Sequence, residues 1–211
     1  MINKKFDKIK SIIDEKLILW RKEPIGGMIV FRPKGLEVYC DEGTVSLLEL
    51  IKKGIGFEEI IDLIKKYYKI SYEEASRILE KRLDLILELN ISACPETHPY
   101  TSTAPHIAAI EITNVCNLAC KYCYANSSPS EMASMTVNQV LYILDEIKKA
   151  NIPHLWITGG EPLLHPEIER ILREAAKRDF YIVLATNGIP LYNNNKKLIL
   201  LKNMLMKFKW H

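Results

Sequence analysis

Apolar residues in the first part of the chain recur at helical spacing, interrupted by two short β-rich runs. Phe6, Ile9, Ile13 and Leu17 share one helical face and predict a helix over residues 3–20. Two strands and then three helices are expected after it, at residues 28–32, 36–40, 44–53, 57–68 and 72–90. This order predicts a winged helix-turn-helix-like α+β module, with a generic small α/β domain as the alternative.

Downstream, strand-like and helical patterns alternate. Strands are expected at 107–113, 154–158 and 181–185, with helices at 137–150 and 166–178 between them. This βαβαβ order predicts an α/β fold with a parallel sheet and right-handed crossovers. Each βα unit takes roughly 30 residues, so three units fit into this region and cannot close a barrel. No fourth strand can be read from the lysine-, leucine- and methionine-rich tail, and we expect a chain cut short or read out of frame there.

A proline-rich segment separates the two regions. Residues 92–105 contain three prolines and several small polar residues, which cannot sustain a helix and therefore predict a linker. The expected organisation is a module at 1–91, a linker at 92–105, a partial α/β domain at 106–195 and an atypical tail at 196–211.

Composition narrows the class of protein. The chain has 48% hydrophobic residues and a formal charge of +3, which is ordinary for a globular protein and too weak to indicate nucleic acid or membrane partners. No apolar run approaches the ~20 residues that span a bilayer, and the N-terminus is not a signal peptide. Three of the five cysteines are clustered. We therefore expect a cytoplasmic protein whose cysteines serve a metal or catalysis rather than disulfides.

The clustered cysteines have the spacing Cys116-x3-Cys120-x2-Cys123. Thiolates are soft ligands suited to zinc or iron–sulfur clusters, and three on one loop can hold three corners of a cube while a fourth metal stays open. Structural zinc requires four ligands, and the candidates for a fourth, His106, Cys94 and His98, lie at no zinc-like interval. Cys40 and Cys94 are isolated and are interpreted as small hydrophobic residues.

Two polar motifs follow the next two expected strands. Gly159-Gly160-Glu161-Pro162 offers glycines that let a ligand approach the backbone and an acid that can accept from an ammonium group, although such a sequence can also be a simple turn. Thr186-Asn187-Gly188 is equally consistent with a polar site and with a common turn. Because the carboxyl ends of parallel strands share one edge, all three motifs are expected together. Structural roles are favoured for His154 and His165.

In this order the motifs resemble the radical S-adenosylmethionine (radical SAM) superfamily. The resemblance implies the first three βα units of a partial (β/α)6 radical SAM barrel. It also implies a [4Fe–4S] cluster on Cys116, Cys120 and Cys123, whose open iron is chelated by S-adenosylmethionine. The cofactor contacts that it implies are Tyr122, Gly159, Gly160, Glu161 and Asn187. A ferredoxin or flavodoxin would supply the electron that cleaves the cofactor to a 5′-deoxyadenosyl radical.

The upstream module resembles the PqqD-like winged-helix element fused to many peptide-maturing radical enzymes. That element binds a leader peptide as an added strand, so the implied substrate is a ribosomal peptide or small protein. No residue can be assigned to substrate catalysis. The alternatives are a catalytically incompetent truncated remnant, a winged-helix metal-sensing regulator and a zinc-binding structural domain. The acidic residues of segment 72–90 disfavour DNA binding.

Overall fold

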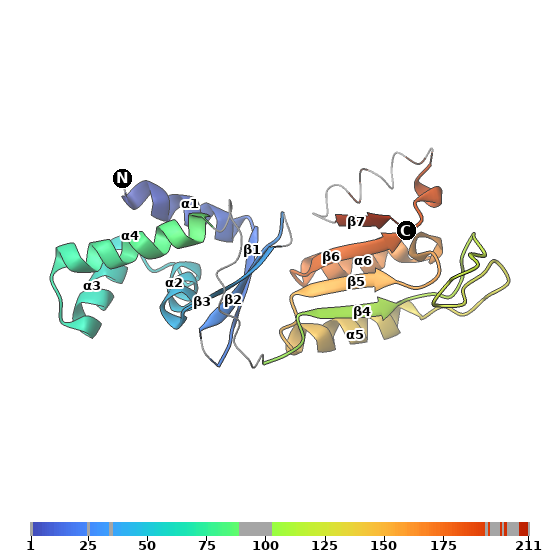
Figure 1. Ribbon diagram of the computed structural model, residues 1–211, viewed down its shortest axis with the longest axis horizontal. Coiled ribbons are helices and arrows are strands. Elements are labelled where there is room, and N and C mark those ends of the chain that lie inside the picture. The colour runs from blue at the N-terminus through green and yellow to red at the C-terminus, as the bar shows by residue number, and fades with distance from the viewer. Residues whose placement is uncertain are drawn as a thin grey trace. The chain divides into compact units, whose positions relative to one another are not determined.

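The computed structural model describes residues 2–24, 26–33, 36–88 and 103–192, together with 194, 199, 201 and 207–210. The chain divides into two compact units, Met1–Thr103 and Ala104–His211, and each is described by itself (Figure 1). Most of the predicted linker, residues 92–102, lies outside the described part. Within the described part, no helix combines the length and apolarity needed to cross a membrane.

The first unit joins a helix, a three-stranded antiparallel sheet and three further helices. Helix α1 (Ile2–Asp14) is followed by β1 (Ile18–Lys22), β2 (Gly27–Phe31) and β3 (Leu36–Cys40), in the sheet order β1-β2-β3. The chain continues through α2 (Glu42–Lys52), α3 (Phe57–Tyr68) and α4 (Tyr72–Glu88). Helices α1 and α3 both pack against α4, and one hydrophobic core includes buried residues of the helices and the sheet.

The predicted helix over residues 3–20 is wrong in its last third. Helix α1 ends at Asp14, and Lys16 then takes a left-handed conformation (φ 55°) that turns the chain away from the helix axis. Residues 18–22 instead form β1, which pairs with β2 from Ile18 opposite Phe31 onward. The sheet therefore has three strands where the sequence predicted two, because the apolar residues after Lys16 fit a strand as well as a helix.

The second unit contains a parallel sheet in the order β4-β5-β6-β7. Its strands are β4 (Ile107–Glu111), β5 (His154–Thr158), β6 (Tyr181–Thr186) and β7 (Lys207–Trp210). Helices α5 (Val137–Lys149) and α6 (Ile168–Lys177) lie on the same side of the sheet in Figure 1, as right-handed crossovers require. Two 3-10 turns, η1 (Pro162–Leu164) and η2 (Ile189–Leu191), follow β5 and β6. The core between sheet and helices includes Leu144, Leu155 and Ile171.

Strand β7 corrects the prediction that the tail holds no fourth strand. It runs parallel to β6, with Val183 opposite Lys207 and Thr186 opposite Trp210. Its sequence, Lys-Phe-Lys-Trp, alternates charged and aromatic residues at the period of a strand. With only four residues, that alternation is too short to stand out in a lysine-rich tail.

Candidate functional site

Residues 112–135, which follow β4, form a closed loop that carries the three cysteines. Its ends are joined where the Met135 N–H donates to the Ile112 carbonyl at 2.9 Å. Further along, Val115 bridges to Ser128, and the Cys116 N–H donates to the Ser128 carbonyl at 3.3 Å. Figure 1 shows this loop extending from the arrowhead end of β4.

The three cysteines differ in exposure and are all free thiols. Cys116 is buried, Cys123 is half-buried and Cys120 is exposed. The Leu118 N–H donates to Cys116 Sγ at 3.4 Å, and the Ser127 N–H donates to Cys123 Sγ at 3.4 Å. Backbone N–H groups thus already point at two of the three sulfur atoms that would serve as ligands.

The donor set is three thiols on one loop, which suits an iron–sulfur cluster. Among the described residues, no group of three or more His, Cys, Asp or Glu side chains is gathered closely enough to hold a metal ion. Zinc needs its ligands within about 2.3 Å of one point. A four-iron cluster instead spreads its cysteine ligands over separate iron atoms, and hydrogen bonds to the sulfurs tune its potential. Three thiols on one loop, two of them already receiving N–H donors, match that requirement.

Gly159 and Gly160 let the turn after β5 pack closely against the backbone segment that precedes Cys116. The Gly160 N–H donates to the Thr113 carbonyl at 2.7 Å, and the Glu161 N–H donates to the Val115 carbonyl at 2.8 Å. A Cβ on Gly159, whose φ is +131°, would lie 2.2 Å from the Thr113 oxygen, and one on Gly160 would lie 2.3 Å from the Val115 oxygen. The close approach in this structure is therefore to the cysteine loop's own backbone.

Glu161 is fully buried and links the turn after β5 to the end of β6. Its Oε1 accepts from Thr186 Oγ1 at 2.6 Å and from the Leu163 N–H at 3.0 Å. Its Oε2 accepts from the Asn187 N–H at 2.8 Å. A carboxylate offers about four acceptor positions, so these three bonds occupy most of them.

Asn187 brings the third motif to the cysteine loop. Its Nδ2 donates to Asn117 Oδ1 at 2.8 Å and lies 4.0 Å from Cys116 Sγ, while its Oδ1 accepts from the Ile189 N–H at 3.0 Å. The structure thus joins three motifs that lie far apart in the sequence. Asn117 is the direct hydrogen-bond partner of Asn187. The sequence analysis did not identify Asn117, although its position next to the first cysteine could have indicated it.

Tyr122 stays apart from these contacts. Its side chain is 88% exposed, with Lys121 Nζ 5.5 Å from the ring centroid. Tyr124, which was not singled out, connects the loop to β5 through a 3.0 Å hydrogen bond between its hydroxyl and Thr158 Oγ1.

The two histidines are both buried and have neighbours within the second unit. His154 is buried, with its ring 4.9 Å from that of Tyr181. His165 Nδ1 accepts from the Glu167 N–H at 3.1 Å, so Nε2 carries the proton and donates to the Met135 carbonyl at 2.7 Å.

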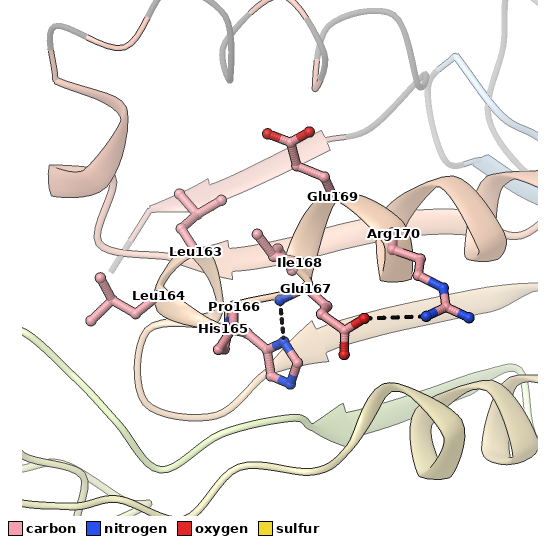
Figure 2. A pocket seen from close by; sticks show the side chains of 8 residues that line it. All are labelled: Leu163, Leu164, His165, Pro166, Glu167, Ile168, Glu169 and Arg170. Atoms are coloured by element: carbon pink, nitrogen blue, oxygen red, sulfur yellow. Dashed lines mark hydrogen bonds and ion pairs between the residues drawn. The ribbon is translucent and has the colours of Figure 1, made fainter.

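A hollow of about 470 Å³ lies beside His165 and is lined by residues 163–170 (Figure 2). All of its lining residues come from one continuous segment, and none is a cysteine or another predicted cofactor contact. Ligand sites bring polar groups from several elements together, so we assign no role to this hollow.

Comparison with known proteins agrees with the chemistry of the site. Residues 110–207 match the family model of the Radical SAM superfamily. This segment, slightly less than half of the chain, is therefore similar in sequence to a radical SAM domain.

Two of the curated relatives show how much of the chain is matched. The first is the AdoMet-dependent heme synthase of Methanosarcina barkeri, 36% identical over 91 residues, which cover 43% of this chain and 26% of that protein. The second is the antilisterial bacteriocin subtilosin biosynthesis protein AlbA of Bacillus subtilis, 30% identical over 95 residues, which cover 45% and 21%. The matched part of the chain thus spans about a quarter of each relative's length.

Among solved structures, the chain is similar to Streptococcus suis SuiB bound to precursor peptide SuiA. The TM-score is 0.53 at 18% identity, over 88% of this chain and 44% of SuiB. Identity at this level shows similarity of fold alone. Since 88% exceeds the share of either unit, the similarity includes residues of both.

Proposed function

We propose that this chain is part of a radical SAM enzyme that modifies a ribosomal peptide or small protein. Cys116, Cys120 and Cys123 hold the [4Fe–4S] cluster, and the cofactor lies against the motifs that end β5 and β6. The observation that supports this most is the contact of Asn187 with Asn117 and its approach to Cys116, together with the bond from its N–H to Glu161.

The chain's residues organise the site rather than perform the cleavage. A [4Fe–4S] cluster held by Cys116, Cys120 and Cys123 would supply the one-electron reduction of S-adenosylmethionine, with a ferredoxin or flavodoxin as the electron donor, and with it the radical chemistry of the enzyme. The N–H groups of Leu118 and Ser127 point at two of the three ligand sulfur atoms. Glu161 fixes the turn after β5, leaving about one acceptor position for the cofactor's ammonium group.

The first unit has the layout needed to recognise a peptide backbone. It contains a small antiparallel sheet whose outer strands, β1 and β3, each pair on one side only within the described residues. An extended peptide can add to such an edge through main-chain hydrogen bonds. The fold similarity to SuiB, whose structure was solved with a precursor peptide, supports a leader-binding role for this unit.

The test is anaerobic reconstitution with iron and sulfide, followed by reduction and assay for 5′-deoxyadenosine and methionine. We expect cluster uptake and equal amounts of the two products. Cluster uptake without nucleoside would support a remnant without activity. A colourless, zinc-loaded chain would reject the proposal.

Two cysteine variants make the assay specific. Cys120→Ala removes an exposed thiol and should abolish cluster uptake without disturbing the core. Cys40→Ala is the matched control, because burial raises the pKa of Cys40 to about 12 and keeps it a neutral thiol. Cys40→Ala should retain the iron and sulfide content of the unaltered chain.

A further inference from the structure

Ser127 presents a buried hydroxyl without a partner inside the cysteine loop. The residue is 4% exposed, and among the described residues its Oγ has no hydrogen-bond partner. Nearby hydroxyls are satisfied: Ser128 Oγ pairs with Ser130 Oγ at 2.7 Å, and Thr113 Oγ1 pairs with Ser134 Oγ at 2.6 Å. A buried hydroxyl without a partner is unfavourable, so its retention calls for an explanation.

The backbone on both sides of Ser127 is fixed. Asn126 takes a left-handed conformation (φ 48°), and its N–H donates to the Cys123 carbonyl at 3.3 Å. On the other side Ser128 bridges to Val115. Ser127 itself donates its N–H to Cys123 Sγ at 3.4 Å. The loop therefore holds this residue beside a cluster ligand by contacts that do not involve its hydroxyl.

We propose that the Ser127 hydroxyl is a positioning group that donates a hydrogen bond to a sulfur atom of the bound cluster, either the Cys123 thiolate or an inorganic sulfide. This inference rests on the proposed function. A hydroxyl hydrogen rotates freely to suit an acceptor, and anionic sulfur is the acceptor that cluster binding would bring to this place. Because one-electron reduction adds negative charge to the cluster, the hydrogen bond stabilises the reduced form more and raises the reduction potential.

The test compares Ser127→Ala with Ser130→Ala in the full chain. Ser130→Ala removes a nearby exposed hydroxyl that is paired with Ser128. The clusters are reconstituted anaerobically, and their reduction potentials are measured without S-adenosylmethionine. Ser127→Ala should shift the one-electron equilibrium roughly tenfold toward the oxidised form, a potential about 59 mV lower. Ser130→Ala should match the unaltered chain, and Ser127→Thr, which keeps a hydroxyl, should restore most of the potential.

The unfolding midpoint of the cluster-free chain is the second measurement. Since the hydroxyl has no partner there, Ser127→Ala should leave its unfolding midpoint unchanged or slightly raised. A lowered midpoint with an unchanged potential would assign Ser127 to the fold and overturn the inference. A potential that shifts only after S-adenosylmethionine is added would make the cofactor the acceptor and overturn it as well. Failure of the unaltered chain to take up a cluster would reject the proposed function itself, before any variant is compared.

Discussion

At the scale of single residues, Glu161 has a structural role that can be separated from cofactor binding. In Glu161→Gln the new amide NH2 must face a backbone N–H, that of Leu163 or that of Asn187, whichever way the amide turns. Two donors then oppose each other in a buried place, which costs about 1–3 kcal/mol. We expect the free energy of unfolding of the cluster-free chain to fall by that amount, as measured by urea denaturation.

Glu167→Gln is the control for this substitution. Its carboxylate is exposed and pairs with Arg170 three residues later, so the expected change is below about 0.5 kcal/mol. Equal stability of Glu161→Gln and Glu167→Gln would contradict the buried network around Glu161.

Gly160 gives a second prediction at this scale. In Gly160→Ala the added Cβ would lie 2.3 Å from the Val115 oxygen, which is backbone and can move only by displacing the cysteine loop. We expect a loss of about 1–3 kcal/mol in unfolding free energy, together with reduced cluster uptake measured as bound iron and sulfide. Gly56→Ala, where an added Cβ meets nothing within 4 Å, should leave bound iron and sulfide unchanged, and it should lower stability only through the weaker N-cap that Ala makes for α3.

A candidate site residue could be predicted only where the sequence around it forms a recognisable motif. Cys116, Glu161 and Asn187 could be predicted as candidates because each belongs to a short motif that follows a strand. Asn117 and Tyr124 were missed because a lone polar residue in a loop has no periodicity. Their partners lie 70 and 34 positions away in the sequence, a separation that only the folded sheet closes.

At the scale of elements, Asp41 caps α2, and its contacts lead us to expect that the stability of the chain depends on pH. It accepts from the Thr44 N–H at 2.7 Å and pairs with Arg82. Partial burial alone would raise the pKa of Asp41, but these contacts outweigh it and hold the pKa below its ordinary value. The stabilisation is therefore fully present above the unfolded-state pKa of about 3.9 and is lost as the pH falls through the lower folded-state pKa.

The matching experiment compares Asp41→Ala and Asp41→Asn by thermal and urea unfolding between pH 7 and pH 2. Asp41→Ala should lose about 1 kcal/mol at pH 7, and its difference from the unaltered chain should shrink below pH ~4. Asn is an equally good cap but does not ionise, so Asp41→Asn should stay closer in stability without following that titration. A difference that is constant across the pH range would contradict the assignment.

The elements that the sequence predicted well are those with their own end signals. The capping boxes at Ser71–Glu74 and at Thr136–Gln139 both form, and α4 and α5 begin directly after the first residue of each box. Strands β1 and β7 were missed because each is short and its stability comes from pairing with a neighbour. A sequence of four or five residues does not show which neighbouring strand will pair with it.

At the scale of the whole molecule, the described residues form two hydrophobic cores that share no residue among them. The contacts that organise the cysteine loop belong to the second unit, while the sheet edge proposed to bind a peptide belongs to the first. Selective damage to one core should therefore separate peptide binding from cluster binding.

Leu79→Ala and Leu144→Ala form a matched pair for testing this independence. Both leucines are fully buried on helices, Leu79 on α4 and Leu144 on α5, and each substitution should destabilise its own unit by about 2–5 kcal/mol. Hydrogen exchange read segment by segment is the measurement. Leu79→Ala should speed exchange in α1, α3 and α4 while leaving β5 and β6 unchanged, and Leu144→Ala should do the reverse. Faster exchange in both units from either substitution would mean that they unfold as one cooperative body, and damage to one core would then impair both activities.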